Sequence, residues 1–551
     1  MTTSLRPLPL TPTRLRPISA PSAPGAPSAD RSGATHATDR AERTTPVVVD
    51  HLLTALRVDL TLAGFTVEGV AERLGPLATS ALHREQPVAA LLATAAATDP
   101  CGVLIALFTL GETVTPAAVE AALPTVGLGG AVRLRLVQEA FEGVRARCDL
   151  RPYGDDGGTS VQGGAGGSGH DWWVASDLGE LQTGTTLRPD HVLGIGGAST
   201  TLASWTVRRP VERALDLGTG CGVQALHLSA HASSVVATDV SERARDFAVF
   251  NAALNETQLA VYVGDMLEPV AGQRFSLVVS NPPFVITPRV DGVPHYEYRD
   301  GGRTGDALVR SLVREVAAVL EPGGVAQLLG NWEVPRGRTW REVWGEWLDG
   351  VGLDAWVVQR DTQDPVEYAE LWSRDGGVLP GTRQQRHLVT AWLRDFAGRD
   401  IESIGFGVVT LQRPLTPRTP WRDLCEVTGP VVPAMGPVID AGLRARTWLA
   451  EHDDAEVLAV AWSCAADVTE ERYGRPGADD PNVILFRQGG GLRREMRADT
   501  VLAAYLGVAD GELTARVALE AIADLVGADA AAVRAEVTPS LRELIADGLL
   551  L

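Results

Sequence analysis

Four consecutive residues, Asn281, Pro282, Pro283 and Phe284, form the part of the sequence best suited to chemistry. They follow a strand-like apolar run that begins at Phe275, so they belong to a loop at the carboxyl end of a buried strand, where open α/β sheets bind ligands. Two prolines fix two φ angles and remove two N–H donors, which leaves the Asn281 side chain and nearby carbonyls as oriented acceptors. Acceptors beside an aromatic ring suit a flat group that carries an NH2.

A second motif lies upstream, where a strand-like run ending at Leu217 continues into the glycine-rich turn Gly218-Thr219-Gly220-Cys221-Gly222. Glycines let a ligand approach the backbone closely, and the start of the following helix supplies N–H donors. Val223 occupies the place where a dinucleotide-binding fold has its third glycine. The turn therefore indicates a nucleotide-type ligand other than NAD.

Two further strand ends carry carboxylates. Asp239 ends the second predicted strand, where a carboxylate can accept hydrogen bonds from both hydroxyls of a ribose. Gly264-Asp265 ends the third strand and offers an acceptor for an adenine amino group. One glycine turn is a moderate signal, but four strand ends that each carry the expected polar residue are a strong one.

The elements that must position these residues alternate between strand and helix from about residue 186 to residue 415. This alternation predicts a mostly parallel sheet covered on both faces, hence an α/β fold. Helices are expected near 222–231, 241–254 and 305–320, and Glu321-Pro322-Gly323-Gly324 should end the last of them. The expected strands are Arg213–Leu217, Ser234–Asp239, Leu259–Val263, Ser276–Ser280, Val325–Leu329, Ala355–Gln359 and Gly405–Leu411.

The regions before the α/β part divide into a tail and an accessory domain. Residues 1–46 are rich in Pro, Ser, Ala, Thr and Arg, which predicts a disordered tail. Residues 47–185 have helical patterning, with a helix start at Thr115-Pro116, and then two strand-like pieces around a Gly/Ser-rich loop, Gly154 to Gly169. Short helices followed by a hairpin suggest a winged-helix-like module, which either binds nucleic acid or packs against a neighbour.

Residues 416–551 are expected to form a second accessory domain. It contains two strand-like runs, Val457–Trp462 and Val483–Arg487, followed by a helical tail that again suggests a winged helix. In that tail, one helical face carries four apolar residues: Ala518, Ile522, Leu525 and Val526.

Length and composition limit the classes of protein. A chain of 551 residues exceeds one hydrophobic core, so two to four domains are expected. The net charge of −20 argues against broad, sequence-independent phosphate binding, although a local basic patch remains open. The five cysteines form no CxxC pair, which predicts a reducing, cytoplasmic location and no zinc site. No apolar run reaches the ~18 residues of a membrane helix.

Residues ~190–330 resemble a class I S-adenosylmethionine-dependent methyltransferase, since D-L-G-T-G-C-G, Asp239, Gly264-Asp265 and N-P-P-F occur in family order and spacing. The resemblance implies a Rossmann-like, seven-stranded domain over residues 186–415, flanked by mainly helical, winged-helix-like domains. It also implies S-adenosylmethionine as the cofactor and no metal. The residues that would hold this cofactor are Asp216, Gly218, Gly220, Gly222, Asp239 and Asp265.

The N-P-P-[FYW] motif marks the branch of this family that methylates planar nitrogens of adenine, guanine or glutamine. A planar NH2 is a poor nucleophile because its lone pair is delocalised. By the resemblance, the Asn281 side-chain oxygen and the Pro282 carbonyl would accept both NH2 hydrogens, and Phe284 would stack on the flat group. Positioning would then supply most of the rate.

Two features bear on the acceptor. Arg299 to Leu308 resembles the Gly-Gly-x-x-Gly loop of HemK/PrmC-type protein glutamine methyltransferases, which modify release factors. Phe284 replaces their usual Tyr and is common in ribosomal RNA guanine-N2 methyltransferases with a small methyltransferase domain. In Asp190 to Leu202, Gly-Ala-Ser-Thr replaces the Pro-Glu-Thr-Glu core of the HemK/PrmC segment that covers the cofactor.

We therefore expect an N-methyltransferase that acts on a macromolecule of the translation machinery, either a release-factor-like protein glutamine or an RNA base. Two alternatives stay open. One is a catalytically silent, cofactor-binding scaffold whose flanking modules bind protein or nucleic acid, and the other is a small-molecule N-methyltransferase.

Overall fold

The computed structural model describes residues 44–155, 170–184, 187–477 and 481–551. Most of the predicted tail, residues 1–43, and most of the predicted glycine-rich loop, residues 156–169, lie outside these ranges. In the described parts of the chain, no helix is both long enough and apolar enough to cross a membrane.

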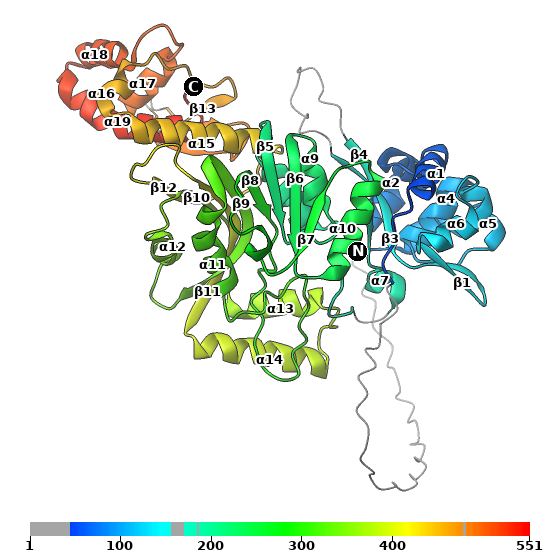
Figure 1. Ribbon diagram of the computed structural model, residues 1–551. Helices are drawn as coiled ribbons and strands as arrows, with labels where there is room; N and C mark the ends of the chain where they lie inside the picture. The colour runs from blue at the N-terminus through cyan, green and yellow to red at the C-terminus, as the bar shows by residue number, and fades with distance from the viewer. Residues whose placement is uncertain (1–43, 156–169, 185–186, 478–480) are drawn as a thin grey trace, which may run out of the picture. The chain divides into compact units, whose positions relative to one another are not determined.

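A mostly parallel sheet of eight strands forms the centre of the fold (Figure 1). All seven strands expected from the sequence are present. The eighth, β12, pairs in parallel with β10 and lies beyond the predicted domain boundary at residue 415, while β11 alone runs antiparallel, between β9 and β10. In sheet order the strands are β12 (Arg422–Glu426), β10 (Asp354–Gln363), β11 (Ile401–Gln412), β9 (Leu320–Pro335), β8 (Phe275–Ser280), β5 (Val211–Leu217), β6 (Ala232–Asp239) and β7 (Ala260–Val263).

Helices cover both faces of this sheet, because successive residues of one strand pack into different apolar clusters. Val357 of β10 belongs to the cluster beneath α11 and α12, whereas its neighbours Trp356 and Val358 belong to the cluster beneath α8, α9 and α15. The predicted helices near 222–231, 241–254 and 305–320 are present. The helices of this domain are α8 (Gly197–Trp205), α9 (Val223–Ser229), α10 (Glu242–Leu254), α11 (Ala307–Glu315), α12 (Trp340–Leu348) and α15 (Met435–Glu451), with short 3-10 turns η2 (Glu268–Val270) and η3 (Val316–Ala318).

The chain between β10 and β11 adds two helices, α13 (Pro365–Asp375) and α14 (Arg383–Gly398), to one edge of this domain. Asp364 caps α13 by accepting hydrogen bonds from two of its amides, and Pro365 occupies the first turn, as is common at helix starts. The Tyr368 hydroxyl accepts from the Ile286 amide at 2.8 Å, and the Trp392 indole donates to the Ile286 carbonyl at 2.7 Å. These bonds fix the chain that follows Phe284.

The N-terminal region has two hairpins, β1–β2 and β3–β4, rather than the single hairpin expected. Helices α1 to α6 precede these hairpins, and the short α7 follows them. The predicted Thr115 cap is confirmed, since its side chain accepts from Ala118 N at 3.2 Å. The elements are α1 (Asp50–Leu62), α2 (Val67–Leu82), α3 (Val88–Thr94), α4 (Pro100–Leu104), the π-helical turn η1 (Ile105–Thr109), α5 (Pro116–Ala122), α6 (Gly127–Arg133), β1 (Val137–Ala140), β2 (Gly143–Ala146), β3 (Asp149–Asp155), β4 (His170–Ser176) and α7 (Glu180–Thr183).

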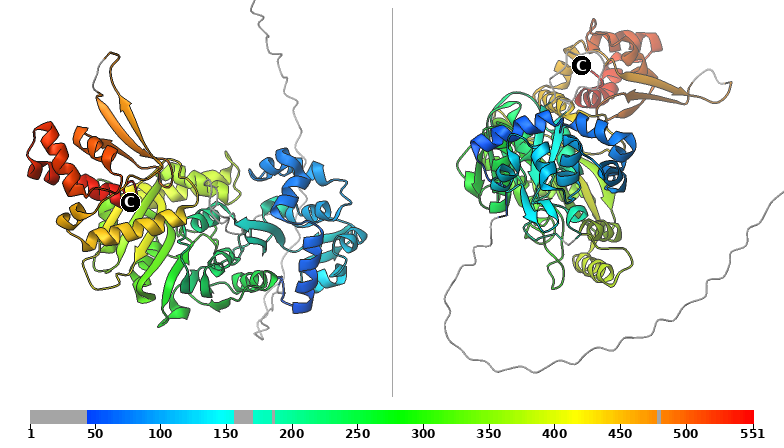
Figure 2. Two further views of the ribbon diagram at one scale, coloured as in Figure 1. Left: turned by 90° about the horizontal axis from the view of Figure 1, so that it is seen from above. Right: turned by 90° about the vertical axis from the view of Figure 1, so that its right-hand side faces the viewer.

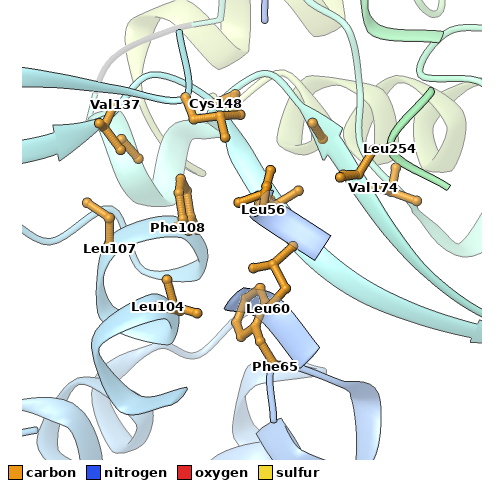
Figure 3. Packing of buried hydrophobic residues seen from close by; sticks show 14 of the residues in the cluster. Leu56, Leu60, Phe65, Leu104, Leu107, Phe108, Val137, Cys148, Val174 and Leu254 are labelled. Atoms are coloured by element: carbon orange, nitrogen blue, oxygen red, sulfur yellow. The ribbon is translucent and has the colours of Figure 1, made fainter. Parts of the chain in front are cut away.

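One apolar core joins this N-terminal region to the central domain. Figure 3 shows Leu56, Leu60 and Phe108 gathered with Val174 of β4 and Leu254 of α10. Polar contacts reinforce it, since Asn251 of α10 and Asn255, which follows that helix, each exchange hydrogen bonds with the β4 backbone at 2.8–2.9 Å. A shared core of this kind fixes the N-terminal region against the outer side of α10.

The C-terminal region is built on α15, against which α19 packs (Figure 2). The predicted strand Val457–Trp462 is wrong: Asp453 caps a helix, Asp454–Ala459, and the first half of the predicted strand belongs to it. Val483–Arg487 is confirmed as a strand. Leu525 and Val526 are 87% and 52% exposed, so only Ala518 and Ile522 of the predicted apolar face are buried. The elements are α16 (Asp454–Ala459), β13 (Val468–Tyr473), β14 (Val483–Gln488), β15 (Glu495–Ala498), α17 (Thr500–Val508), α18 (Ala515–Val526) and α19 (Ala530–Ala546).

Candidate active site

Asp216 of β5 stabilises the glycine turn between β5 and α9. This carboxyl group is fully buried and accepts hydrogen bonds from Thr219 Oγ1 at 2.5 Å and from the Ala225 amide at 3.0 Å. Burial raises the pKa of Asp216 to about 7. Oδ2 makes both of these bonds, to the turn and to α9, while Oδ1 is buried with no hydrogen-bond partner in the described parts of the chain.

The three glycines of the turn all have left-handed backbone conformations. At Gly218 (φ 72°) and Gly220 (φ 55°), an added Cβ would meet nothing within 4 Å, so both face open space. At Gly222 (φ 86°), an added Cβ would lie 3.1 Å from the Ala248 Cα of α10. The first two glycines therefore leave room for a ligand, and the third allows two helices to approach.

Asp239 closes the turn from the neighbouring strand. Its carboxylate accepts from the Gly220 amide and from the Ser241 amide, both at 2.9 Å. Burial raises the pKa of Asp239, while these two amides lower it. Each carboxylate oxygen keeps acceptor capacity for a ligand hydroxyl.

Asn281 directly follows β8, which pairs with β5 on the side opposite β6. The Ser280 hydroxyl donates to the Leu217 carbonyl at 2.8 Å, which ties the ends of β8 and β5 together. Asn281 Oδ1 is buried and has no hydrogen-bond partner in the described parts of the chain. A buried acceptor without a donor is costly, so its position indicates a ligand that supplies one.

The rest of the predicted loop frames this asparagine. Pro282 is buried and Pro283 is half-buried. The half-buried Phe284 ring meets the Trp372 ring of α13 edge-on, with 6.4 Å between centroids. The Val285 amide donates to the Arg299 carbonyl at 2.8 Å, which attaches the loop to the segment 293–300.

A pocket, which we call the cofactor pocket, brings the two halves of the site together. Of the residues expected from the sequence, Gly218, Gly220, Asp239 and Asn281 line it. The other expected residues do not line it: Asp216, Gly222, Asp265, Pro282 and Phe284.

Asp265 occupies a more exposed position than its expected role in adenine binding requires. Its side chain is 63% exposed and lies 3.7 Å from Arg303 of the Gly-Gly-x-x-Gly loop. The next residue, Met266, lines the cofactor pocket instead and has a left-handed φ of 43°. At the end of β7, Met266 rather than Asp265 therefore lines the pocket.

Two further segments complete the pocket, and the first lies within Asp190 to Leu202, the stretch that the resemblance places over the cofactor. His191 lines it from one segment, and Glu297 and Tyr298 line it from the other. The Glu297 amide donates to the Pro189 carbonyl at 2.9 Å, so the two segments are joined. Sequence reasoning missed the second segment, because the residues around Glu297 and Tyr298 have neither a strand nor a helix pattern.

Burial shifts the pKa values of two residues in these segments, His191 and Glu297. Burial lowers the pKa of His191, whose Nδ1 lies 3.9 Å from Asp177 Oδ2, so a neutral imidazole is favoured. Asp177 is itself held by Arg243 and by the Val192 amide. Burial raises the pKa of Glu297, and the Ser241 hydroxyl lowers it. A carboxyl group thus stands on each side of Ser241.

The donors and acceptors of the pocket fit S-adenosylmethionine. Two glycines without a nearby Cβ contact leave space for the methionine end, and Asp239 with Glu297 offers carboxylates to ribose hydroxyls. Asn281 Oδ1 provides an unpaired acceptor opposite them. No group of three or more His, Cys, Asp or Glu side chains arranged for a metal occurs in the described residues.

Comparison with known families agrees with this geometry. The family model of the methyltransferase small domain matches residues 194–347, which hold the glycine turn, Asp239 and the Asn-Pro-Pro-Phe loop. Residues 194–347 are a methyltransferase small domain. It is a class I methyltransferase domain, and β5 to β9 with their helices form its core.

Individual relatives of the methyltransferase small domain divide between two acceptors. The chain is 31% identical over 159 residues to the ribosomal RNA small subunit methyltransferase C of Alcanivorax borkumensis, covering 29% of this chain and 42% of that one. It is 39% identical over 124 residues to the release factor glutamine methyltransferase of Deinococcus radiodurans, covering 21% and 44%. It is also 34% identical over 131 residues to the ribosomal protein uL3 glutamine methyltransferase of Xanthomonas campestris, covering 22% and 42%.

The three relatives named above match only part of this chain, between 21% and 29% of it. The chain spans less than half the length of each of these curated relatives. Residues 62–147 match a second family model, described as a domain of unknown function (DUF7059). That match covers most of the helical N-terminal region and its first hairpin, which precede the methyltransferase small domain.

Proposed function

We propose that this protein transfers a methyl group from S-adenosylmethionine to a planar NH2 on a macromolecule of the translation machinery. The acceptor is either a protein glutamine, as the HemK-like loop suggests, or an RNA base. The observation that carries the proposal is the buried, unpaired Asn281 Oδ1 in the same pocket as Gly218, Gly220 and Asp239.

The residues of the chain divide the work as follows. Gly218 and Gly220 leave space for the methionine end of the cofactor, and Asp239 accepts from its ribose, with Glu297 beside it. The resemblance assigns the adenine amino group to Asp265, although Met266 rather than Asp265 lines the pocket there. Bound S-adenosylmethionine supplies an electrophilic methyl group on a positively charged sulfur.

Asn281 and its neighbours hold the acceptor nitrogen. Asn281 Oδ1 and the Pro282 carbonyl accept its two hydrogens, which orients the nitrogen and increases the density of its lone pair. Phe284, supported by Trp372, lies against the flat group. The nitrogen forms its bond to the methyl carbon as the carbon–sulfur bond breaks, and it gives up one proton, which the neutral His191 in the same pocket can accept.

The proposal is tested by incubating the protein with cell lysate and labelled S-adenosylmethionine, and then dividing the sample between RNase and protease. Label that survives RNase and is lost with protease identifies a protein acceptor, and the reverse identifies RNA. If the protein binds the cofactor but labels neither polymer, the proposal fails and the silent scaffold becomes the better account. Label only in small molecules would favour the small-molecule alternative.

A further inference from the structure

A second cavity lies between the N-terminal region and the central domain, and we call it the interdomain cavity. The N-terminal region contributes Glu85, Asp149 and Arg151 to its wall, and α13 contributes Arg374 and Asp375. The two regions share one apolar core across α10, so this cavity belongs to a single folded unit.

The interdomain cavity adjoins the cofactor pocket. Both are lined by His191, Leu193, Gly194 and Tyr298, so these four residues form the boundary between the two spaces. A molecule in the interdomain cavity therefore lies directly beside the space where the cofactor fits.

The interdomain cavity also adjoins the loop that holds the acceptor. Arg299 donates to the Trp372 carbonyl at 3.1 Å and to Asp375 Oδ2 at 2.7 Å, and the Tyr298 hydroxyl donates to the same Asp375 oxygen at 3.4 Å. Trp372 is the ring that meets Phe284. The cavity wall at Asp375 is thus connected to the Asn-Pro-Pro-Phe loop through one residue, Arg299.

The charges of this wall are only partly neutralised. Arginines pair with three of its carboxylates: Arg151 with Asp149, Arg243 with Asp177, and Arg299 with Asp375. Glu180 has no such close arginine partner: burial raises its pKa, Arg299 and the Leu187 amide lower it, and its Oε1 is buried with no hydrogen-bond partner in the described parts of the chain. Glu85 stands exposed on the N-terminal wall.

These charges favour a cationic ligand over a polyphosphate in the interdomain cavity. A buried carboxylate oxygen without a donor is costly, and a cationic side chain would supply the donor. Nucleic acids need clustered positive charge, whereas Arg374 is the one arginine of this wall with no carboxylate partner in the described residues, and the chain carries a net charge of −20. A polypeptide that carries Lys or Arg near the methylated amide matches both facts.

We propose that the interdomain cavity admits the methyl acceptor and that this acceptor is a polypeptide segment with a cationic side chain near the methylated amide. The N-terminal region then selects the substrate, and Glu85 and Glu180 bind its positive charge. This inference rests on the proposed function and narrows its acceptor.

The test uses three charge variants of the full chain in the labelled-lysate assay. Glu85→Lys and Glu180→Gln should each lower methyl transfer to the protein fraction about tenfold, while Arg374→Glu should leave it unchanged or raise it. Their affinity for S-adenosylmethionine, measured by calorimetry, should match the wild type. Glu139→Lys makes the same charge change on the exposed strand β1, away from the cavity, and should behave as wild type.

The outcomes separate this inference from the function on which it rests. If the wild type labels protein and none of the three charge variants changes that labelling, the proposed role of the cavity is overturned. Labelling of RNA, lowered by Arg374→Glu and raised by Glu85→Lys, overturns the polypeptide and assigns the cavity to a nucleic acid. A wild type that labels no polymer overturns the proposed function itself.

Discussion

The Gly220 amide donates a hydrogen bond to the Asp239 carboxylate, with 2.9 Å between nitrogen and oxygen. This bond joins the glycine turn after β5 to the end of β6, so the space for the methionine end and the acceptor for the ribose are built as one structure. The cofactor pocket depends on that connection.

Replacing Asp239 by Ala should therefore weaken S-adenosylmethionine binding about 10- to 100-fold, because charged hydrogen bonds to the ribose are lost and the turn loses its support. Calorimetric titration measures the change. Asp265→Ala should have a smaller effect, since that carboxylate is 63% exposed. Equal losses in the two variants would contradict the arrangement of the pocket described above.

Two glycine substitutions should separate fold stability from ligand binding. Gly222→Ala adds a Cβ 3.1 Å from Ala248 Cα at a left-handed φ, so it should lower the free energy of unfolding by about 2–4 kcal/mol. Gly218→Ala meets no neighbour and should cost about 1–2 kcal/mol while weakening cofactor binding. Chemical denaturation checks the order, and a reversed order would be inconsistent with the packing of the turn on α10.

The pKa of Asp216 predicts a pH-dependent stability. Folding raises this pKa to about 7, so the folded chain binds the proton more tightly than the unfolded chain, in which the pKa is about 3.9. The stabilising contribution is complete below about pH 4 and is lost as the pH rises through about 7. Relative to Asp216→Asn, the wild type should lose at most about 4 kcal/mol across this range.

Denaturant titrations at several pH values measure that difference. Asp265→Asn provides the control, because it makes the same change from carboxylate to amide on a side chain that is 63% exposed. A flat difference for Asp216→Asn would show that the buried carboxyl group does not titrate as described.

The shared core predicts that the N-terminal region and the methyltransferase small domain unfold together. Asn251 is fully buried and makes three hydrogen bonds of 2.8 Å, two to Ala175 of β4 and one to the Cys221 carbonyl. Asn251→Ala should lower the unfolding free energy by about 3 kcal/mol in one cooperative transition. Calorimetric scans that resolve a separate N-terminal transition would argue against this coupling.

Much of the central fold could be predicted because its signals are local. Alternating strand and helix patterns identified seven of the eight strands, and the polar residues at their carboxyl ends identified Gly218, Gly220, Asp239 and Asn281 as pocket residues. Parallel strands end at one edge of a sheet, so spacing along the chain was enough to bring these residues together.

The parts of the fold and of the site that were not predicted depend on tertiary contacts, which a local sequence pattern does not reveal. Val457–Trp462 has the apolar character of a strand, but the Asp453 cap and packing against α18 and α19 make it begin as a helix. His191 and Glu297 lie in irregular segments, and a backbone bond from Glu297 to Pro189 brings those segments to the pocket. The interdomain cavity arises only when the N-terminal region packs on α10.

The central claim is that Asn281 holds the acceptor nitrogen, and it is tested most directly by measuring cofactor binding and methyl transfer on Asn281→Ala. Asn482→Ala serves as the control, since Asn482 is exposed in the C-terminal region. The account predicts unchanged affinity for S-adenosylmethionine and transfer reduced at least about 100-fold in Asn281→Ala. Transfer near the wild-type rate in that variant would contradict it.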